Sequence, residues 1–246
     1  MIVMGTAPAR EPTCCSPNRV VLRLTWNETA WVSIGLLGAV SLIVLTSQGV
    51  MPGSQVTFLM ELVFPALCAI LVVPMATVDR DYGMEEMLNA AATPSSVRVS
   101  RRLAYVMAIP VALTVPFTLI FCAIAGIFRT GQLSVPPFTL ALSSMSLVLF
   151  MSGVAFLATA ATGALAVGYS AVPAVFIGVL TLKRFLSGAF QPFPIAASLG
   201  RDLAAFSAEP ICDTGLFWAN RIGYGAVGIA LIALGVIIMH VLRRGY

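Results

Sequence analysis

Residues 130–182 read TGQLSVPPFTLALSSMSLVLFMSGVAFLATAATGALAVGYSAVPAVFIGVLTL, and none of these residues is charged. A helix needs about 20 apolar residues to cross the hydrocarbon layer of a membrane, so this run is too long for one helix and long enough for two. Small residues surround Thr162 and Gly163, where two helices can approach each other closely. We therefore divide the run there and predict membrane-spanning helices over residues 138–161 and 164–182.

Charge-free windows elsewhere in the chain hold four more spans. Of the 246 residues, 59% are hydrophobic and 10% are charged, whereas about a quarter of the residues of a soluble protein are charged. This composition excludes a water-soluble enzyme with solvated faces. We predict an all-α, polytopic membrane protein in which residues 29–246 form one domain of six transmembrane helices. The four additional predicted spans are residues 30–50, 56–78, 103–128 and 222–242.

The charged residues lie almost entirely between these spans and predict an orientation. Nine of the 14 Lys and Arg residues fall on the side that holds both termini and the segment between the second and third spans, and five fall on the other side. By the positive-inside rule, both termini are cytoplasmic in a cell (plasma) membrane protein. The net charge of +4 does not indicate a nucleic-acid partner, because the basic residues form no dense run. The lipid bilayer is the expected surrounding.

Residues 1–28 lack the apolar core of a signal peptide and are predicted to form a cytoplasmic arm. Apolar residues from Val20 to Trp26 alternate with Arg19, Arg23 and Glu28, which indicates a short helix at the lipid headgroups. A frayed terminus is the alternative interpretation of this arm.

The chain contains few groups suited to catalysis or metal binding. Its five cysteines include no CxxC pair, and its one histidine, His240, lies near the end of the sixth span. We predict no catalytic site and no metal site, and no cofactor bound by this chain. The sequence also lacks the GxxxxGK[ST] loop that cradles the phosphates of ATP.

The most polar stretch, residues 79–96, lies between the second and third spans on the predicted cytoplasmic side. Asp81 is a suitable N-cap for a short helix, and Met84, Met87, Leu88 and Ala91 recur on one face of it. Thr93 and Pro94 suit the start of the next helix, because proline in a first turn loses no hydrogen bond. The stretch therefore predicts a short amphipathic helix held between two transmembrane helices.

This order of residues resembles the permeases of ABC-2 type exporters. The resemblance rests on an acidic-basic-acidic start, Gly83, Glu85-Glu86, Met87-Leu88, Thr93-Pro94-Ser95 and basic residues opening the third span. Six spans and an interfacial helix before the first span are similar to that family as well. The resemblance implies a coupling helix that docks on an ATPase, with these contact residues: Arg80, Asp81, Tyr82, Gly83, Met84, Glu85, Glu86, Met87, Leu88, Ala91, Thr93 and Pro94.

The same resemblance implies the partners and the activity. Two copies of an ATP-binding cassette subunit would bind ATP and Mg and hydrolyse ATP, so this chain itself would not be an enzyme. A second permease subunit, identical or related, would complete the pathway. The expected function is export of an amphipathic or hydrophobic substrate, such as a drug, antibiotic, peptide or lipid.

Residues 183–221 form a long segment between the fifth and sixth spans on the predicted outer side. In the family that the chain resembles, this region is a pair of re-entrant helices that roof the outer gate. The gate residues so implied are Phe190, Pro192, Phe193 and Pro194. A helix lying flat on the outer leaflet is the alternative.

Glu61 is the one acidic residue inside a predicted span. A charged side chain at membrane depth is costly, so Glu61 should face protein or water and have a partner. We expect it either on the translocation pathway or dimer seam, or as a protonated or hydrogen-bonded acid near the outer boundary.

Two other functions remain open at this point. An intramembrane enzyme would need a nucleophile and base, or paired aspartates, for which the sequence gives no pattern. A secondary carrier independent of an ATPase would usually carry several charges within its spans, and Glu61 is the one that the windows contain.

Overall fold

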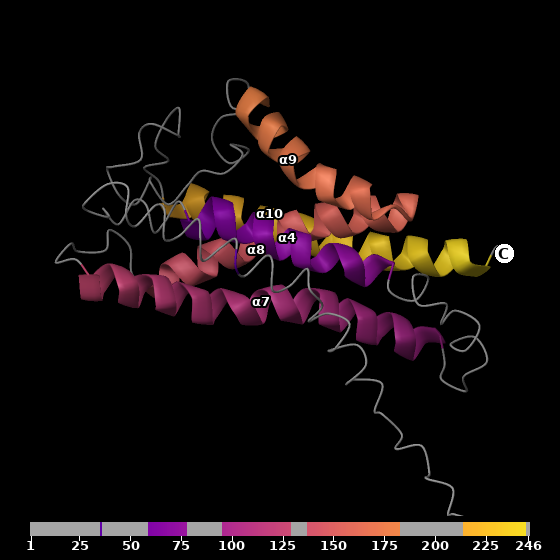
Figure 1. Ribbon diagram of the computed structural model, residues 1–246, viewed down its shortest axis with the longest axis horizontal. Coiled ribbons are helices and arrows are strands. Elements are labelled where there is room, and N and C mark those ends of the chain that lie inside the picture. The colour runs from indigo at the N-terminus through magenta and orange to yellow at the C-terminus, as the bar shows by residue number, and fades with distance from the viewer. Residues whose placement is uncertain (1–34, 36–58, 78–94, 129–136, 183–213, 245–246) are drawn as a thin grey trace, which may run out of the picture.

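A computed structural model describes residue 35 and residues 59–77, 95–128, 137–182 and 214–244, and every element in these ranges is helical (Figure 1). This confirms the all-α prediction for the described part of the chain. The predictions for residues 1–28, 80–94 and 183–213 lie outside it, as does the prediction for residues 30–50 apart from residue 35. The elements are η1 (Leu59–Val63), α4 (Phe64–Val72), η2 (Val73–Ala76), α7 (Ser95–Phe128), α8 (Pro137–Thr162), α9 (Leu165–Leu182) and α10 (Thr214–Arg244).

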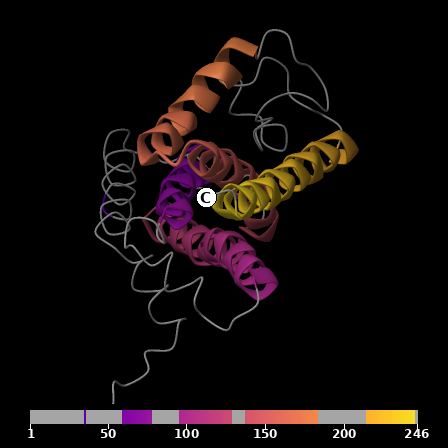
Figure 2. The ribbon, with the colours of Figure 1, turned by 90° about the vertical axis from the view of Figure 1, so that its right-hand side faces the viewer.

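Helix α8 is the centre of the bundle. It packs against α4, α7, α9 and α10, and its contact with α10 is the most extensive. Helices α4, α8 and α10 run in one direction, whereas α7 and α9 run the opposite way, and α9 leans away from the bundle along its second half (Figures 1 and 2). We call the end at which α4, α8 and α10 begin the Glu61 end, and the opposite end the Thr77 end.

The chain is a membrane protein by the length and composition of its helices. Three helical stretches are long and apolar enough to cross a bilayer, namely Leu103–Ala123, Phe138–Thr162 and Phe217–Val241. Shorter apolar helices cover Phe64–Ala76 and Leu165–Val175. Large apolar side chains also lie on the outside of the bundle, where lipid tails would solvate them. Examples on α7 and α10 are Val115, Leu119, Ile120, Ile222, Ile237 and Val241. The count of six spans stays a prediction.

The break between α8 and α9 falls where the sequence placed it. Gly163 has a φ of 69°, which is the left-handed conformation that glycine adopts without a steric cost. Its N–H donates a hydrogen bond of 2.7 Å to the carbonyl of Thr159, which satisfies one of the last carbonyls of α8. The charge-free run is thus two helices joined by a turn of two residues, Gly163 and Ala164.

Two prolines explain why the second predicted span is irregular. Its described part begins as a π-helix, η1, continues as α4 and ends as a 3₁₀-helix, η2. In a continuous α-helix, the N–H groups of residues 65 and 74 would donate hydrogen bonds to carbonyls one turn earlier. Pro65 and Pro74 have no backbone N–H group. Each proline lies instead in the first turn of its own helix, where no such donor is required.

Helix α10 corrects the predicted sixth span. The helix begins at Thr214, eight residues before the predicted start at Ile222, so Arg221 belongs to a helix and not to the preceding loop. A span defined as a charge-free stretch cannot include Arg221. This definition fails where a charged residue is paired inside the protein. Helix α7 likewise begins at Ser95, directly after Thr93 and Pro94, and continues without interruption into the third predicted span.

Candidate functional site

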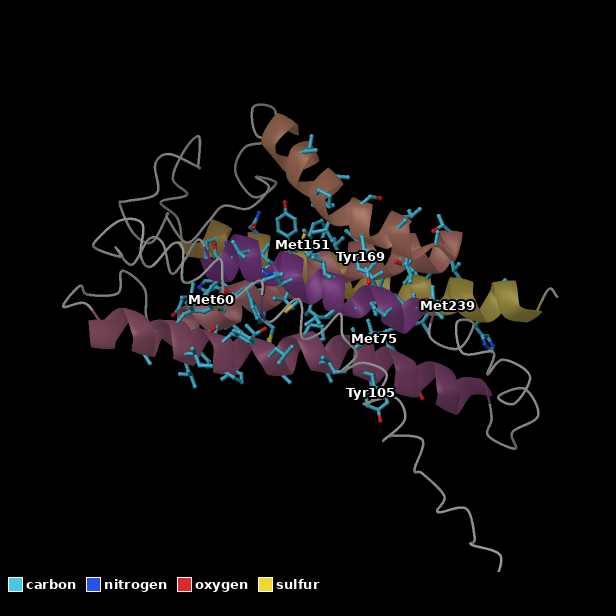
Figure 3. All side chains as sticks on the ribbon, in the orientation of Figure 1. Met60, Met75, Tyr105, Met151, Tyr169 and Met239 are labelled. Carbon is cyan, nitrogen blue, oxygen red and sulfur yellow. The ribbon has the colours of Figure 1, made fainter. Side chains whose placement is uncertain are left out.

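Glu61 forms a buried ion pair with Arg221 near the Glu61 end. The Arg221 Nη2 atom donates to Glu61 Oε2 at 2.9 Å, and the side chains are each 1% exposed. One partner comes from the π-helical start of the second span and the other from α10, 160 residues later. Met60, beside Glu61 in the chain, marks this end of the bundle in Figure 3, and Met75 and Met239 lie toward the other end.

A third helix joins the pair through Ser143. The Ser143 hydroxyl donates to Glu61 Oε1 at 2.8 Å and also lies 3.1 Å from the carbonyl oxygen of Leu140, one turn earlier in α8. Ser143 is fully buried. The two carboxylate oxygens therefore have different partners, because Oε2 accepts from α10 and Oε1 accepts from α8. We call Glu61, Ser143 and Arg221 the polar triad.

Arg221 is further stabilised by an aromatic ring on its own helix. Its guanidinium carbon lies 5.0 Å from the centroid of the Phe217 ring, one turn earlier in α10. A cation above an aromatic face is attracted by the negative charge density of the ring, by about 2 kcal/mol where the pair is desolvated. Phe217 is itself fully buried and packs edge-on against Trp218. The ring thus replaces part of the hydration that Arg221 loses.

A buried apolar cluster contains residues close to Glu61 and Ser143 in the chain. Met60, Phe64 and Leu140 belong to one buried cluster, against which Phe117 of α7 also packs. The rings of Phe64 and Phe117 lie 5.1 Å apart by their centroids. Water is excluded from this cluster, so the charges of the polar triad interact through a medium of low polarity.

The energetics of such a pair are asymmetric. Taking two charges out of water costs several kcal/mol per ion, and their attraction and hydrogen bonds offset this cost without a large surplus. Removing one partner is different, because the other charge stays buried and uncompensated, which costs about 3–5 kcal/mol. We therefore expect the intact pair to add little to the stability of the chain, and the loss of either partner to be costly.

The triad consists of groups that are suited to an ion pair and to hydrogen bonds between helices. It contains a carboxylate, a hydroxyl and a guanidinium group, but no imidazole or thiol, and no group of three potential metal ligands occurs among the described residues. These contacts join η1, α8 and α10. The chemistry of the triad is that of a structural contact.

Of the predicted site residues, Glu61 alone lies in the described ranges. The expectation that it faces protein and has a partner is met by Arg221 and Ser143. No described contact tests whether it lies on a pathway or dimer seam. The coupling residues from Arg80 to Pro94 and the gate residues Phe190, Pro192, Phe193 and Pro194 all lie outside the described residues.

Sequence reasoning missed Arg221, Ser143 and Phe217. Arg221 falls at the end of the predicted outer segment, residues 183–221, and not in a predicted span. A signal for Arg221 was present, since an acid buried in a span needs a base at the same depth and Arg221 adjoins the sixth apolar run. No sequence signal distinguishes Ser143 from Ser144, which donates to the carbonyl of Leu140 within its own helix.

Comparisons with protein-family models, with curated proteins and with solved structures find no match to this chain.

Proposed function

We propose that this chain is the membrane-spanning permease subunit of an ATP-driven exporter of the ABC-2 type. Two copies of a separate ATPase would dock on residues 80–94, and a second permease subunit would complete the pathway. The cargo would be amphipathic or hydrophobic, and both termini would be cytoplasmic in the cell membrane. The residue pattern from Arg80 to Arg102 suggests the family, and the arrangement of the helices supports a mechanical role for that segment.

The observation that carries the proposal is the position of the two helices that residues 78–94 connect. The preceding element, η2, ends at the Thr77 end of the bundle, and α7 begins there with Ser95 (Figure 1). Helix α10 also ends there, with Arg243 and Arg244. The positive-inside rule makes this the cytoplasmic end, where an ATPase would be found.

The contacts of η2 supply a route for force into the bundle. A β-carbon added at Gly168 of α9 would lie 3.0 Å from both γ-carbons of Val73 and would collide with the hydroxyl of Thr159 in α8. Val73, the first residue of η2, thus packs against both α8 and α9. Because packed helices move as rigid bodies, a displacement of residues 78–94 would move the α8–α9 turn as well.

The test is co-purification with an ATPase. The chain is purified in mild detergent from cells that also express its natural partner proteins. The bound proteins are identified by mass spectrometry. We expect a subunit with a phosphate loop, and we expect E85R/E86R to lose it because charge reversal would repel the docking surface. D202R/E209R carries the same change of charge in the segment predicted on the other side and should retain the ATPase.

The proposal fails if no such subunit binds, or if E85R/E86R binds it as well as the native chain does. Normal efflux by E85R/E86R in cells would also exclude the coupling role. Both variants must reach the membrane at native levels, which a blot of the membrane fraction measures.

One observation favours a second candidate, a secondary carrier. Among the described residues, a second charged side chain is buried in an apolar helix, because Arg221 lies in α10 and pairs with Glu61. Buried charges in transmembrane helices are common on the ion pathways of carriers. Proton-driven uptake by the purified chain alone in liposomes would support this candidate and exclude the exporter.

A further inference from the structure

We infer that the polar triad is a latch that closes the Glu61 end of the bundle and opens when water reaches its charges. The latch joins three helices that run in the same direction, with Glu61 from η1, Ser143 from α8 and Arg221 from α10. Its meaning for transport rests on the proposed function, because an open Glu61 end would correspond to the outward-facing state of the exporter.

The burial of the pair makes the contact two-state. While the triad is dry, separating Glu61 from Arg221 is costly, because each charge would lose its ion-pair partner while it stays buried. Once water enters, each charge regains its hydration, and the helices separate at little electrostatic cost. An apolar contact of the same volume would lack this second state, since water would not solvate it.

Glu61 lies on an irregular segment, the π-helical start of the described part of the second span. The carboxylate of Glu61 is carried by the five-residue π-helix η1, which precedes Pro65 of α4. Short π segments within helices are frequent at functional sites, and their wider turns are less tightly packed than an α-helix. The contacts from α8 and α10 thus end on η1, the π-helical segment directly before α4.

The experiment measures whether the Glu61 end is open. Leu140, one turn before Ser143 and 1% exposed, is replaced by cysteine in the full-length chain. The purified protein in detergent micelles is treated with a water-soluble maleimide, and the modification at residue 140 is followed by mass spectrometry of its peptide. We expect slow modification of L140C alone and a rate at least about tenfold higher in L140C/E61Q, because Arg221 then lacks its counter-charge.

Two further variants distinguish local opening of the latch from a general loss of structure. E61M/R221M replaces the pair by apolar side chains of similar length, and in it L140C should react no faster than in the native background. V236C reports on the other end, since Val236 is buried in α10 in the cluster with Val72 and Phe156. Its rate should be the same with and without E61Q.

Three results would overturn the latch. The first is an unchanged rate at L140C in E61Q, and the second is a parallel rise at V236C, which would show that the whole bundle has loosened. The third is fast modification of L140C in E61M/R221M. Where E61Q does not accumulate, S143A takes its place, because it removes one hydrogen bond to Glu61; an unchanged rate at L140C in S143A is then the overturning result.

These outcomes are independent of those for the exporter. The latch is measured on the chain alone, without nucleotide or ATPase. Loss of the latch leaves the ATPase co-purification unaffected, and absence of an ATPase leaves the modification rates unaffected.

Discussion

Gly153 of α8 and Gly228 of α10 face each other so closely that neither has room for a side chain. A β-carbon at Gly153 would lie 2.6 Å from the carbonyl oxygen of Gly228, and one at Gly228 would lie 2.5 Å from the carbonyl carbon of Leu149. Gly235 lies two turns after Gly228, and a β-carbon added there would lie 2.8 Å from the ring of Phe156. Small residues of this kind let two helix backbones meet in a membrane, where van der Waals packing is a main source of association.

Substitution of Gly228 by alanine should therefore separate α8 from α10. We expect G228A to lower the free energy of unfolding by about 1–3 kcal/mol, the usual cost of overpacking. The measurement is the melting temperature of the purified chain in detergent.

The matched control for this prediction is G223A in the same helix. Nothing lies within 4 Å of a β-carbon added at Gly223. In a helix, alanine is more favourable than glycine by about 1 kcal/mol. G223A should melt at the native temperature or above it. Equal melting temperatures for G228A and G223A would contradict the close contact.

The ion pair predicts a strong coupling between two substitutions. E61M and R221M should each destabilise the chain by about 3–5 kcal/mol, because each removes one member of a buried ion pair and leaves the other charge buried. E61M/R221M should recover most of that loss, since no charge then remains buried. Thermal melting of the four proteins gives the coupling free energy of a double-mutant cycle. If the losses in the two single variants simply add in the double variant, Glu61 and Arg221 do not interact.

The turn at Gly163 gives a local prediction. With a φ of 69°, an alanine there should cost about 1–2 kcal/mol, because its β-carbon crowds the following carbonyl. Asparagine tolerates this conformation better, so G163N should lie between G163A and the native chain. Melting temperatures that follow the order native, G163N, G163A would agree, and G163A as stable as native would not.

The orientation is tested by labelling in sealed vesicles. We expect N89C and a cysteine in place of Tyr246 to react from the same side of the membrane, because η2 and α10 both end at the Thr77 end. The native Cys212, two residues before α10 begins, should react from the opposite side. An impermeant thiol reagent applied to inside-out and right-side-out vesicles measures this. N89C reacting together with Cys212 would exclude the coupling role of residues 80–94.

The sequence by itself determined the helical architecture of the described chain. Long apolar runs with few polar groups leave a helix as the one way to satisfy the backbone within each segment, and this is a local requirement. The break at Gly163 and the irregular second span are local as well, because a left-handed glycine and two prolines act on their own turns. These features need no knowledge of neighbouring helices.

Only the tertiary structure decided where the charges and glycines act. The charge of Arg221 predicts a loop residue outside the membrane. In the structure Arg221 is a buried residue of α10, because Glu61, 160 positions earlier in the chain, pairs with it. Gly153 and Gly228 differ from Gly223 only in what lies opposite them. Pairing across helices depends on register and distance between segments remote in the chain, and a single sequence carries neither.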